Sequence, residues 1–167
     1  MELFQLVDAD GNPAGAAERS ACHGDPRLVH LVVHLHVFDA DGRLYMQKRS
    51  RSKDTHPGAW DTSVGGHVMA GEAIADALLR EAHEELGIDA SGARFLLSYR
   101  YGGSFETEMA HVYALQWRGD IIPDPSEIEE GRFFTLSEIE ARVGTGALTP
   151  MFEHELPMLR ASLEARS

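Results

Sequence analysis

Hydrophobic positions along the chain alternate or run together in a way that predicts several strands. Residues 28–38, LVHLVVHLHVF, are apolar and β-branched along most of their length, and a strand pattern resumes at 43–48 after the turn 39–42. These two segments are expected to form a hairpin or a neighbouring pair. Further strands are predicted at 2–8, 93–101, 105–117 and 132–134, with a loop rich in Gly, Ala and Pro between the first of them and Pro26.

A helical period appears most clearly over residues 72–86, and Gly87 follows where a helix end favours left-handed geometry. Its apolar stripe consists of Ala73, Ala77, Leu78 and Ala82. Thr135 and Glu138 have the spacing of a capping box, which predicts a short helix there. Thr149-Pro150 predicts the start of a final helix, which is expected to run to about residue 165 and to pack against the core.

The order of these elements, mixed strands with one central helix and a helical end, favours an α+β fold or a three-layer α/β sandwich. The chain has 167 residues, no internal repeat and no long linker, so residues 1–167 are expected to form a single domain. Cys22 is the only cysteine, which excludes an internal disulfide and fits a reducing cytoplasm. No apolar run reaches the roughly 18 residues of a membrane span, and the acidic start of the chain does not resemble a signal peptide.

The net charge of −12 argues against nucleic acid as the main partner, because an acidic surface repels a phosphate backbone. The same charge would repel a small anionic substrate unless bound cations or local basic side chains reversed the field at the site.

Glu81, Glu84 and Glu85 crowd about one turn of the predicted central helix. Like charges at this spacing repel by a few tenths of a kcal/mol per pair. A solvated helix face is the simpler interpretation, but all three carboxylates share one side, as a hard divalent cation requires of oxygen ligands. Arg80 can brace one of them. Gly65, Gly66 and Gly71 in the preceding loop let the backbone approach a ligand closely.

With these residues the segment resembles a complete Nudix box, which spans residues 66–88. Its pattern is Gly66, five residues, Glu72, seven residues, Arg80-Glu81-Ala82, one residue, Glu84-Glu85, one residue and Gly87-Ile88. Ala82 stands where the Nudix family often has a larger aliphatic residue. The resemblance extends to the flanking strands from about residue 28 to 135.

The resemblance implies a Nudix α/β/α sandwich with a mixed sheet and hydrolysis of a diphosphate linkage. It implies Mg²⁺ or Mn²⁺ held by Glu81, Glu84 and Glu85 with the carbonyl of Gly66. By similarity Arg80 orients a metal-binding carboxylate, Glu72 pairs with Arg80 and Gly87 ends the helix. Either one glutamate is the general base or metal-bound water needs none, and the sequence leaves both open.

The region before the box is similar to isopentenyl-diphosphate isomerase, a Nudix-fold enzyme. By that resemblance Arg49 and Lys53 match residues that bind the substrate diphosphate, although both could simply solvate a loop. The residues that match ligands of a second metal site are His23, His30, His67, Glu106 and Glu108. Ordinary partly buried histidines are the alternative, and His34, His36 and His83 are assigned structural or surface roles.

One departure separates the chain from the isomerase. The position that matches the isomerase's catalytic cysteine is Gly65, and Cys22 lies more than 40 residues upstream. The three box glutamates are all present, as the hydrolases require. A hydrolase is therefore favoured over an isomerase, and over a non-catalytic ligand-binding module with a Nudix fold, since such modules usually lose box carboxylates.

The expected substrate is a nucleoside diphosphate derivative or a small organic diphosphate such as an isoprenoid or thiamine type. Four aromatic residues could stack on its organic group or belong to the core: Trp60, Tyr99, Tyr101 and Phe105. Neither nucleic acid nor a membrane is an expected partner. A homodimer is left open, because many members of the fold form one.

Overall fold

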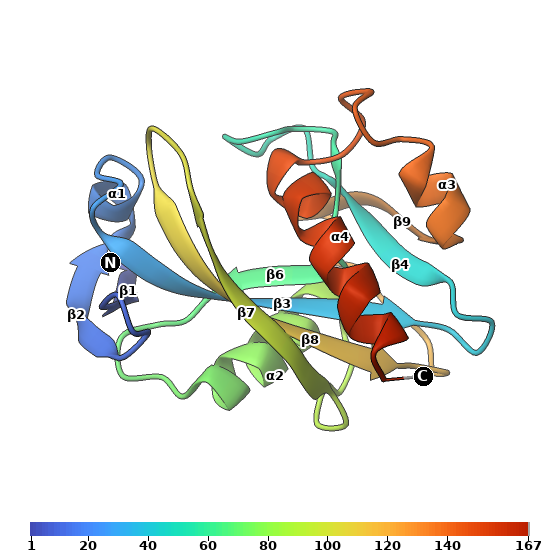
Figure 1. The fold of residues 1–167 in the computed structure, drawn as a ribbon, viewed down its shortest axis with the longest axis horizontal. Coiled ribbons are helices and arrows are strands. Elements are labelled where there is room, and N and C mark those ends of the chain that lie inside the picture. Colours follow the sequence, from blue (N-terminus) through green and yellow to red (C-terminus); the bar gives the residue numbers. More distant parts are fainter. Residues whose placement is uncertain (167) are drawn as a thin grey trace.

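The computed structural model of the protein describes residues 1–166 and contains one mixed sheet with helices on two sides (Figure 1). The strands are β1 (Leu3–Val7), β2 (Pro13–Glu18), β3 (Val29–Phe38), β4 (Leu44–Arg49), β5 (Trp60–Asp61), β6 (Val64–His67), β7 (Arg94–Gly102), β8 (Thr107–Gln116) and β9 (Ile128–Phe134). The helices are α1 (Arg19–Cys22), α2 (Ile74–Leu86), α3 (Leu136–Glu140) and α4 (Pro150–Glu164).

Strand β3 is the centre of the sheet. It runs parallel to β8 along its full length, from the pair Val29 and Thr107 to the pair Phe38 and Gln116. On its other side it pairs antiparallel with β6, with Val32 opposite His67. Strand β7 pairs antiparallel with β8, while β1 and β2 continue the sheet beyond the start of β3. Parallel and antiparallel neighbours together make the sheet mixed.

Two hydrophobic cores lie on the two faces of β3, because successive residues of a strand point to opposite faces. Leu31, Val33, Leu35 and Val37 pack in a core with the buried face of α2. Val32 belongs to the other core, which includes Phe152, Leu156 and Leu159 of α4. In Figure 1, α4 lies across the sheet at β3 and β7, and α2 lies beyond β3 and β8. The predicted α/β/α sandwich with a mixed sheet is confirmed.

The structure differs from the expected elements in two regions. The loop expected before Pro26 contains β2 and the short helix α1, both tied to the sheet through the pairing of β2 with β1. The two strands expected as a hairpin or a neighbouring pair, β3 and β4, do pair antiparallel, but only at Phe38 and Leu44, whereas β4 pairs with β9 from Leu44 to Arg49. The sequence carries no local signal for either pairing. Strand β2 consists mostly of small residues, and β4 and β9 lie far apart in the sequence.

The predicted helix ends are confirmed by their hydrogen bonds. The Thr135 hydroxyl accepts a bond from the Glu138 amide, and the Glu138 carboxylate accepts from the Thr135 amide, which completes the capping box. Thr149 caps α4 through the Phe152 amide, with Pro150 in the first turn. Gly87 ends α2 with φ 65°. Within residues 1–166 no helix has the length and apolar character needed to cross a membrane.

Candidate active site

A cavity of about 750 Å³ opens beside the last residues of β6 and the C-terminal half of α2. Its wall combines residues from α1, the loop after β4, the loop between β5 and β6, the β7–β8 hairpin and the start of α4. Every predicted site residue except His30, Glu72 and Gly87 lines it. Residues far apart in the sequence thus share one wall.

Glu85 is the most deeply buried of the three box glutamates. The apolar stripe of α2 turns this part of the helix toward the sheet, so the carboxylate is buried with an exposure of 8%. The side-chain amide of Gln47 on β4 donates a 2.7 Å hydrogen bond to Glu85 Oε2. Burial raises the pKa of Glu85 to about 8, and the nearby carboxylate of Glu81 adds to this effect, while the bond from Gln47 opposes it. A cation beside Glu85 would relieve this penalty.

Glu81 lies against the backbone of Gly66. A Cβ atom at position 66 would overlap its carboxyl group, so only glycine allows this approach. Arg80 Nη1 lies 2.6 Å from Glu81 Oε1 and 3.4 Å from Glu84 Oε2. Burial raises the pKa of Glu81, and the guanidinium of Arg80 only partly counteracts it.

Arg80 is itself held in place by Glu72 and the backbone. Its Nε and Nη2 lie 2.8 Å and 2.9 Å from the two Glu72 oxygens, and Nη2 donates a 3.0 Å bond to the carbonyl of His67. Two carboxylates therefore share most of the charge of one guanidinium. Glu84, with 58% of its side chain exposed, and buried Glu85 add two further carboxylates at the same place. This excess of acceptor oxygens fits a hard divalent cation such as Mg²⁺ or Mn²⁺.

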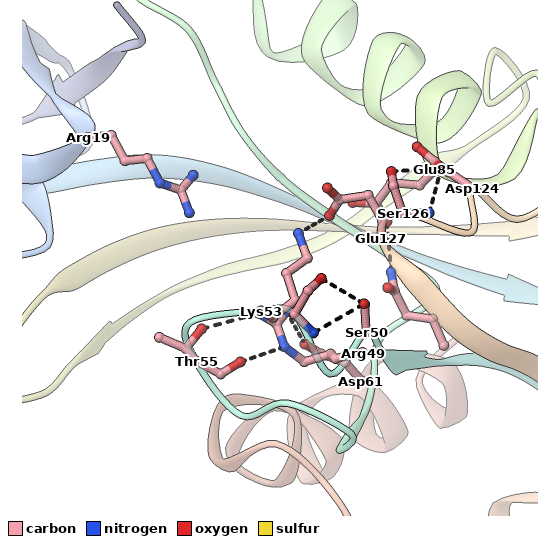
Figure 2. Close-up of polar contacts among 12 residues, drawn as sticks. Arg19, Arg49, Ser50, Lys53, Thr55, Asp61, Glu85, Asp124, Ser126 and Glu127 are labelled. Atoms are coloured by element: carbon pink, nitrogen blue, oxygen red, sulfur yellow. Dashed lines mark hydrogen bonds and ion pairs between the residues drawn. The ribbon is translucent and has the colours of Figure 1, made fainter.

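Basic side chains line the same cavity as the carboxylates, and Figure 2 shows Arg49 and Lys53 in the neighbourhood of Glu85. Lys53 reaches from the loop after β4 to an ion pair with Glu127. Burial and the neighbouring Arg49 guanidinium lower the pKa of Lys53. Arg49 is fixed by the carbonyl and hydroxyl of Thr55 at 3.0 Å and 3.1 Å and by Asp61 at 3.4 Å. Figure 2 also shows Arg19 of α1 pointing into the same space from the opposite side.

The five residues expected at a second metal site lie together at the inner side of the cavity. Possible ligand atoms of His23, His30 and His67 all lie within 4.8 Å of one another, and the same holds for His30, Glu106 and Glu108. Glu108 Oε1 lies 3.6 Å from His30 Nε2 and 3.9 Å from His67 Nε2, beyond hydrogen-bonding distance.

The buried nitrogens of this His–Glu cluster have no hydrogen-bond partner in the described chain: His23 Nε2, both nitrogens of His30 and His67 Nε2. Buried polar atoms of folded proteins are normally bonded, so these nitrogens fit a metal-binding role. Burial lowers the pKa of His67 to about 3, which leaves the imidazole neutral and able to coordinate a metal. The donor set of nitrogens and carboxylate oxygens fits Mn²⁺, Zn²⁺ or Fe²⁺.

The four aromatic residues have different surroundings. Trp60 is buried and packs edge-on against Phe134, and the Tyr99 hydroxyl donates a 2.5 Å bond to Glu155. Tyr101 and Phe105 line the cavity, and Phe105 is 74% exposed at the tip of the β7–β8 hairpin. Only the latter two are available to contact a bound molecule.

Sequence reasoning missed several residues of the cavity wall. Arg19 fell within an expected loop, and Glu127 and Asp124 follow a proline-containing turn, so none carried a local signal. Glu155 did carry a local signal, because it lies three residues after Phe152 and four before Leu159, on the apolar stripe of α4. In the structure it is almost fully buried.

Comparisons with known proteins identify the family of the chain. The NUDIX domain model matches residues 28–154. The chain is 32% identical to the isopentenyl-diphosphate Delta-isomerase of Leifsonia xyli subsp. xyli over 96% of this chain and 92% of that protein. It is 36% identical to the Nudix hydrolase lmo0368 of Listeria monocytogenes over 91% and 90% of the two chains.

Among solved structures, that of DR0079 from Deinococcus radiodurans superposes with a TM-score of 0.81 at 28% identity, covering 93% of this chain and 98% of the other. The fold and the carboxylate-lined cavity are those of an enzyme of the pyrophosphohydrolase type. The chain belongs to the Nudix family.

Proposed function

We propose that the protein hydrolyses the diphosphate linkage of a small molecule, either a nucleoside diphosphate derivative or a small organic diphosphate. Water adds across one P–O–P bridge and two phosphate-bearing products leave. The observation that carries this proposal is the single cavity wall on which Glu81, Glu84 and Glu85 face the basic side chains of Arg49 and Lys53. Carboxylates without a cation would repel a diphosphate, whereas the two sets together suit a cation–diphosphate complex.

Mg²⁺ or Mn²⁺ would be held by the three box carboxylates and the carbonyl of Gly66. When bound, the cation supplies charge neutralisation and a more acidic water. Arg80 orients Glu81, and the Gln47 amide orients Glu85. Lys53, Arg49 and Arg19 hold the phosphate oxygens, and Lys53 exchanges its ion pair with Glu127 for the substrate.

We also propose a second cation in the His–Glu cluster. The proposal is supported by its unpartnered buried nitrogens and by the short separations of its possible ligand atoms. Burial opposes ionisation of Glu108, but the histidines around it outweigh burial and lower its pKa, which keeps a carboxylate available. This cation would lie on the inner side of the substrate cavity, where it would add positive charge.

Position 65 supports hydrolysis rather than isomerisation. Gly65 offers no thiol, and the thiol of Cys22 is fully buried, with a pKa raised by that burial. The cavity wall formed by residues 1–166 contains no cysteine. An isomerase of the kind named among the relatives would therefore lack its thiol here.

Phosphorus NMR with Mg²⁺ tests the function on a panel of nucleoside diphosphates and triphosphates, ADP-ribose, thiamine diphosphate and isopentenyl diphosphate, with Glu85→Gln as the control. Cleavage by the wild type alone supports the hydrolase, and the compound consumed first defines the substrate class. Conversion of isopentenyl diphosphate to its allylic isomer without cleavage would instead establish the isomerase.

Residues 1–167 would act as a single Nudix domain on a small-molecule substrate in the cytoplasm, without nucleic acid or membrane as a partner. A homodimer stays a prediction, which sedimentation of the purified protein would test.

A further inference from the structure

A buried polar cluster joins α4 to the sheet beside the active-site cavity. Glu155 of α4 is 1% exposed, and its carboxylate accepts hydrogen bonds from three side chains. His34 Nδ1 lies 2.6 Å and the Tyr99 hydroxyl 2.5 Å from Glu155 Oε2, while His36 Nε2 contacts Oε1. One carboxylate therefore accepts from three donors, which fixes the proton on the nitrogen of His34 that faces α4.

The opposite edge of the His34 ring faces the cavity. His34 lines the cavity wall although it is only 9% exposed. A Cβ placed on Gly65 would lie 3.6 Å from His34 Cδ2 and 3.9 Å from Nε2, so the bare glycine leaves this edge open to a bound molecule. Nε2 has no hydrogen-bond partner among residues 1–166, unlike Nδ1. His34 is thus a largely buried polar side chain that borders the site.

The contacts of the ring determine which polar atom it presents to the cavity. Glu155 holds Nδ1, so Nε2 is the ring nitrogen left for a bound molecule. A hydroxyl group both donates and accepts, and it can therefore hydrogen-bond to Nε2 in the charged and in the neutral ring.

We propose that His34 is a specificity-determining residue, whose Nε2 forms a hydrogen bond with a hydroxyl of the organic group beyond the diphosphate. Glu155 is a positioning residue, because it holds the ring in this orientation. The inference rests on the proposed hydrolase function and narrows its substrate class. It selects nucleoside diphosphates and other substrates with hydroxyl groups over diphosphates of pure hydrocarbon chains.

The selection follows from what each substrate does to Nε2. A hydroxyl group next to Gly65 forms a hydrogen bond with Nε2, whereas a hydrocarbon chain removes water from Nε2 and provides no partner. A site that leaves a buried polar atom unpaired loses affinity for that ligand. Asp61 and Thr149 also line the cavity and are hydrogen-bonded to each other at 3.0 Å, so the wall near His34 is polar.

The test compares kcat/KM for UDP and for isopentenyl diphosphate in three proteins: wild type, His34→Leu and His36→Leu. His36 is the matched control, because it donates to the same carboxylate from the same strand but does not line the cavity. Both substitutions remove one donor from Glu155 and should destabilise the protein similarly. We expect His34→Leu to lower the UDP-to-isopentenyl preference at least tenfold, equivalent to about 1.4 kcal/mol. His36→Leu should leave this ratio unchanged.

Inhibition by methylene diphosphonate, which has no organic group beyond its two phosphonates, separates substrate selection from general damage. Its inhibition constant should be equal in wild type and His34→Leu. An unchanged substrate ratio in His34→Leu, an equal change in His36→Leu, or a matching loss of diphosphonate inhibition would each overturn the inference.

A wild type that hydrolyses neither compound would reject the proposed hydrolysis of these diphosphates but not the inference itself. Calorimetric binding of the same two compounds in the presence of Mg²⁺ then decides. Tighter binding of UDP that His34→Leu reduces at least tenfold supports the contact, and equal binding of UDP by both proteins rejects it.

Discussion

The carboxyl group of Glu81 occupies the space where a side chain at Gly66 would begin. This contact joins β6 to α2 and places a box carboxylate beside the backbone of Gly66, the two groups expected to share a cation. Gly66→Ala should force Glu81 away and lower turnover by at least tenfold, because the ligand set is distorted. Steady-state kinetics with Mg²⁺ measure the loss.

Gly65→Ala is the control for folding in that experiment. Its Cβ would meet Thr62 at 3.4 Å and His34 at 3.6 Å, which are ordinary contacts. The midpoint of thermal unfolding should fall less in Gly65→Ala than in Gly66→Ala. An equally active Gly66→Ala protein would mean that Glu81 is not a ligand in this arrangement.

Glu84→Gln and Glu85→Gln should each lower turnover by about a hundredfold or more while the fold stays intact, since each removes a charged ligand and no apolar contact. Circular dichroism verifies the fold, and kcat with Mg²⁺ measures the effect. Near-normal turnover in either variant would show that its carboxylate has another role.

Lys53→Ala should raise KM about tenfold and change kcat less, if Lys53 binds phosphate that does not react. Arg51→Ala is the matched control, because Arg51 lies in the same loop, is 78% exposed, pairs with Glu129 and does not line the cavity. Its KM should stay at the wild-type value. A Lys53→Ala effect confined to kcat would contradict the assignment.

His23→Ala should reduce the number of Mn²⁺ ions bound from two to one, because His23 supplies one nitrogen of the His–Glu cluster. Equilibrium dialysis with metal analysis counts the ions in the wild type and in the variant. His83→Ala, which changes an exposed residue of α2 outside the cavity, should bind as many ions as the wild type. A wild type that binds a single ion would reject the second site.

The pKa of His34 gives the metal-free protein a pH-dependent stability. Burial opposes its protonation, but Glu155 raises its folded-state pKa to about 9, above the ordinary 6.5. Its contribution is therefore fully present below pH 6.5 and is lost as the pH rises through about 9. The midpoint of thermal unfolding should fall by a few degrees over this range. In Glu155→Gln the decrease should be smaller, and an identical decrease would contradict this origin.

Sequence reasoning succeeded where the determining forces are local. The stripe of Ala77, Leu78 and Ala82 predicted α2, and the caps at Thr135 and Thr149 were read correctly, because periodicity and capping act within a few residues. The box spacing also placed Glu81, Glu84 and Glu85 on one side of that helix before any fold was known. It could not tell whether the helix faced a cavity.

Tertiary structure decided which distant residues meet. Strand β8 pairs in parallel with β3 although the two lie about 70 residues apart, and that pairing brings Glu108 opposite His30. The register of a parallel pair depends on packing against helices on both faces, for which a strand has no local code. The sequence by itself therefore determined the elements and the box, while packing of α4 on the sheet decided that Glu155 turns inward and directs His34 into the cavity.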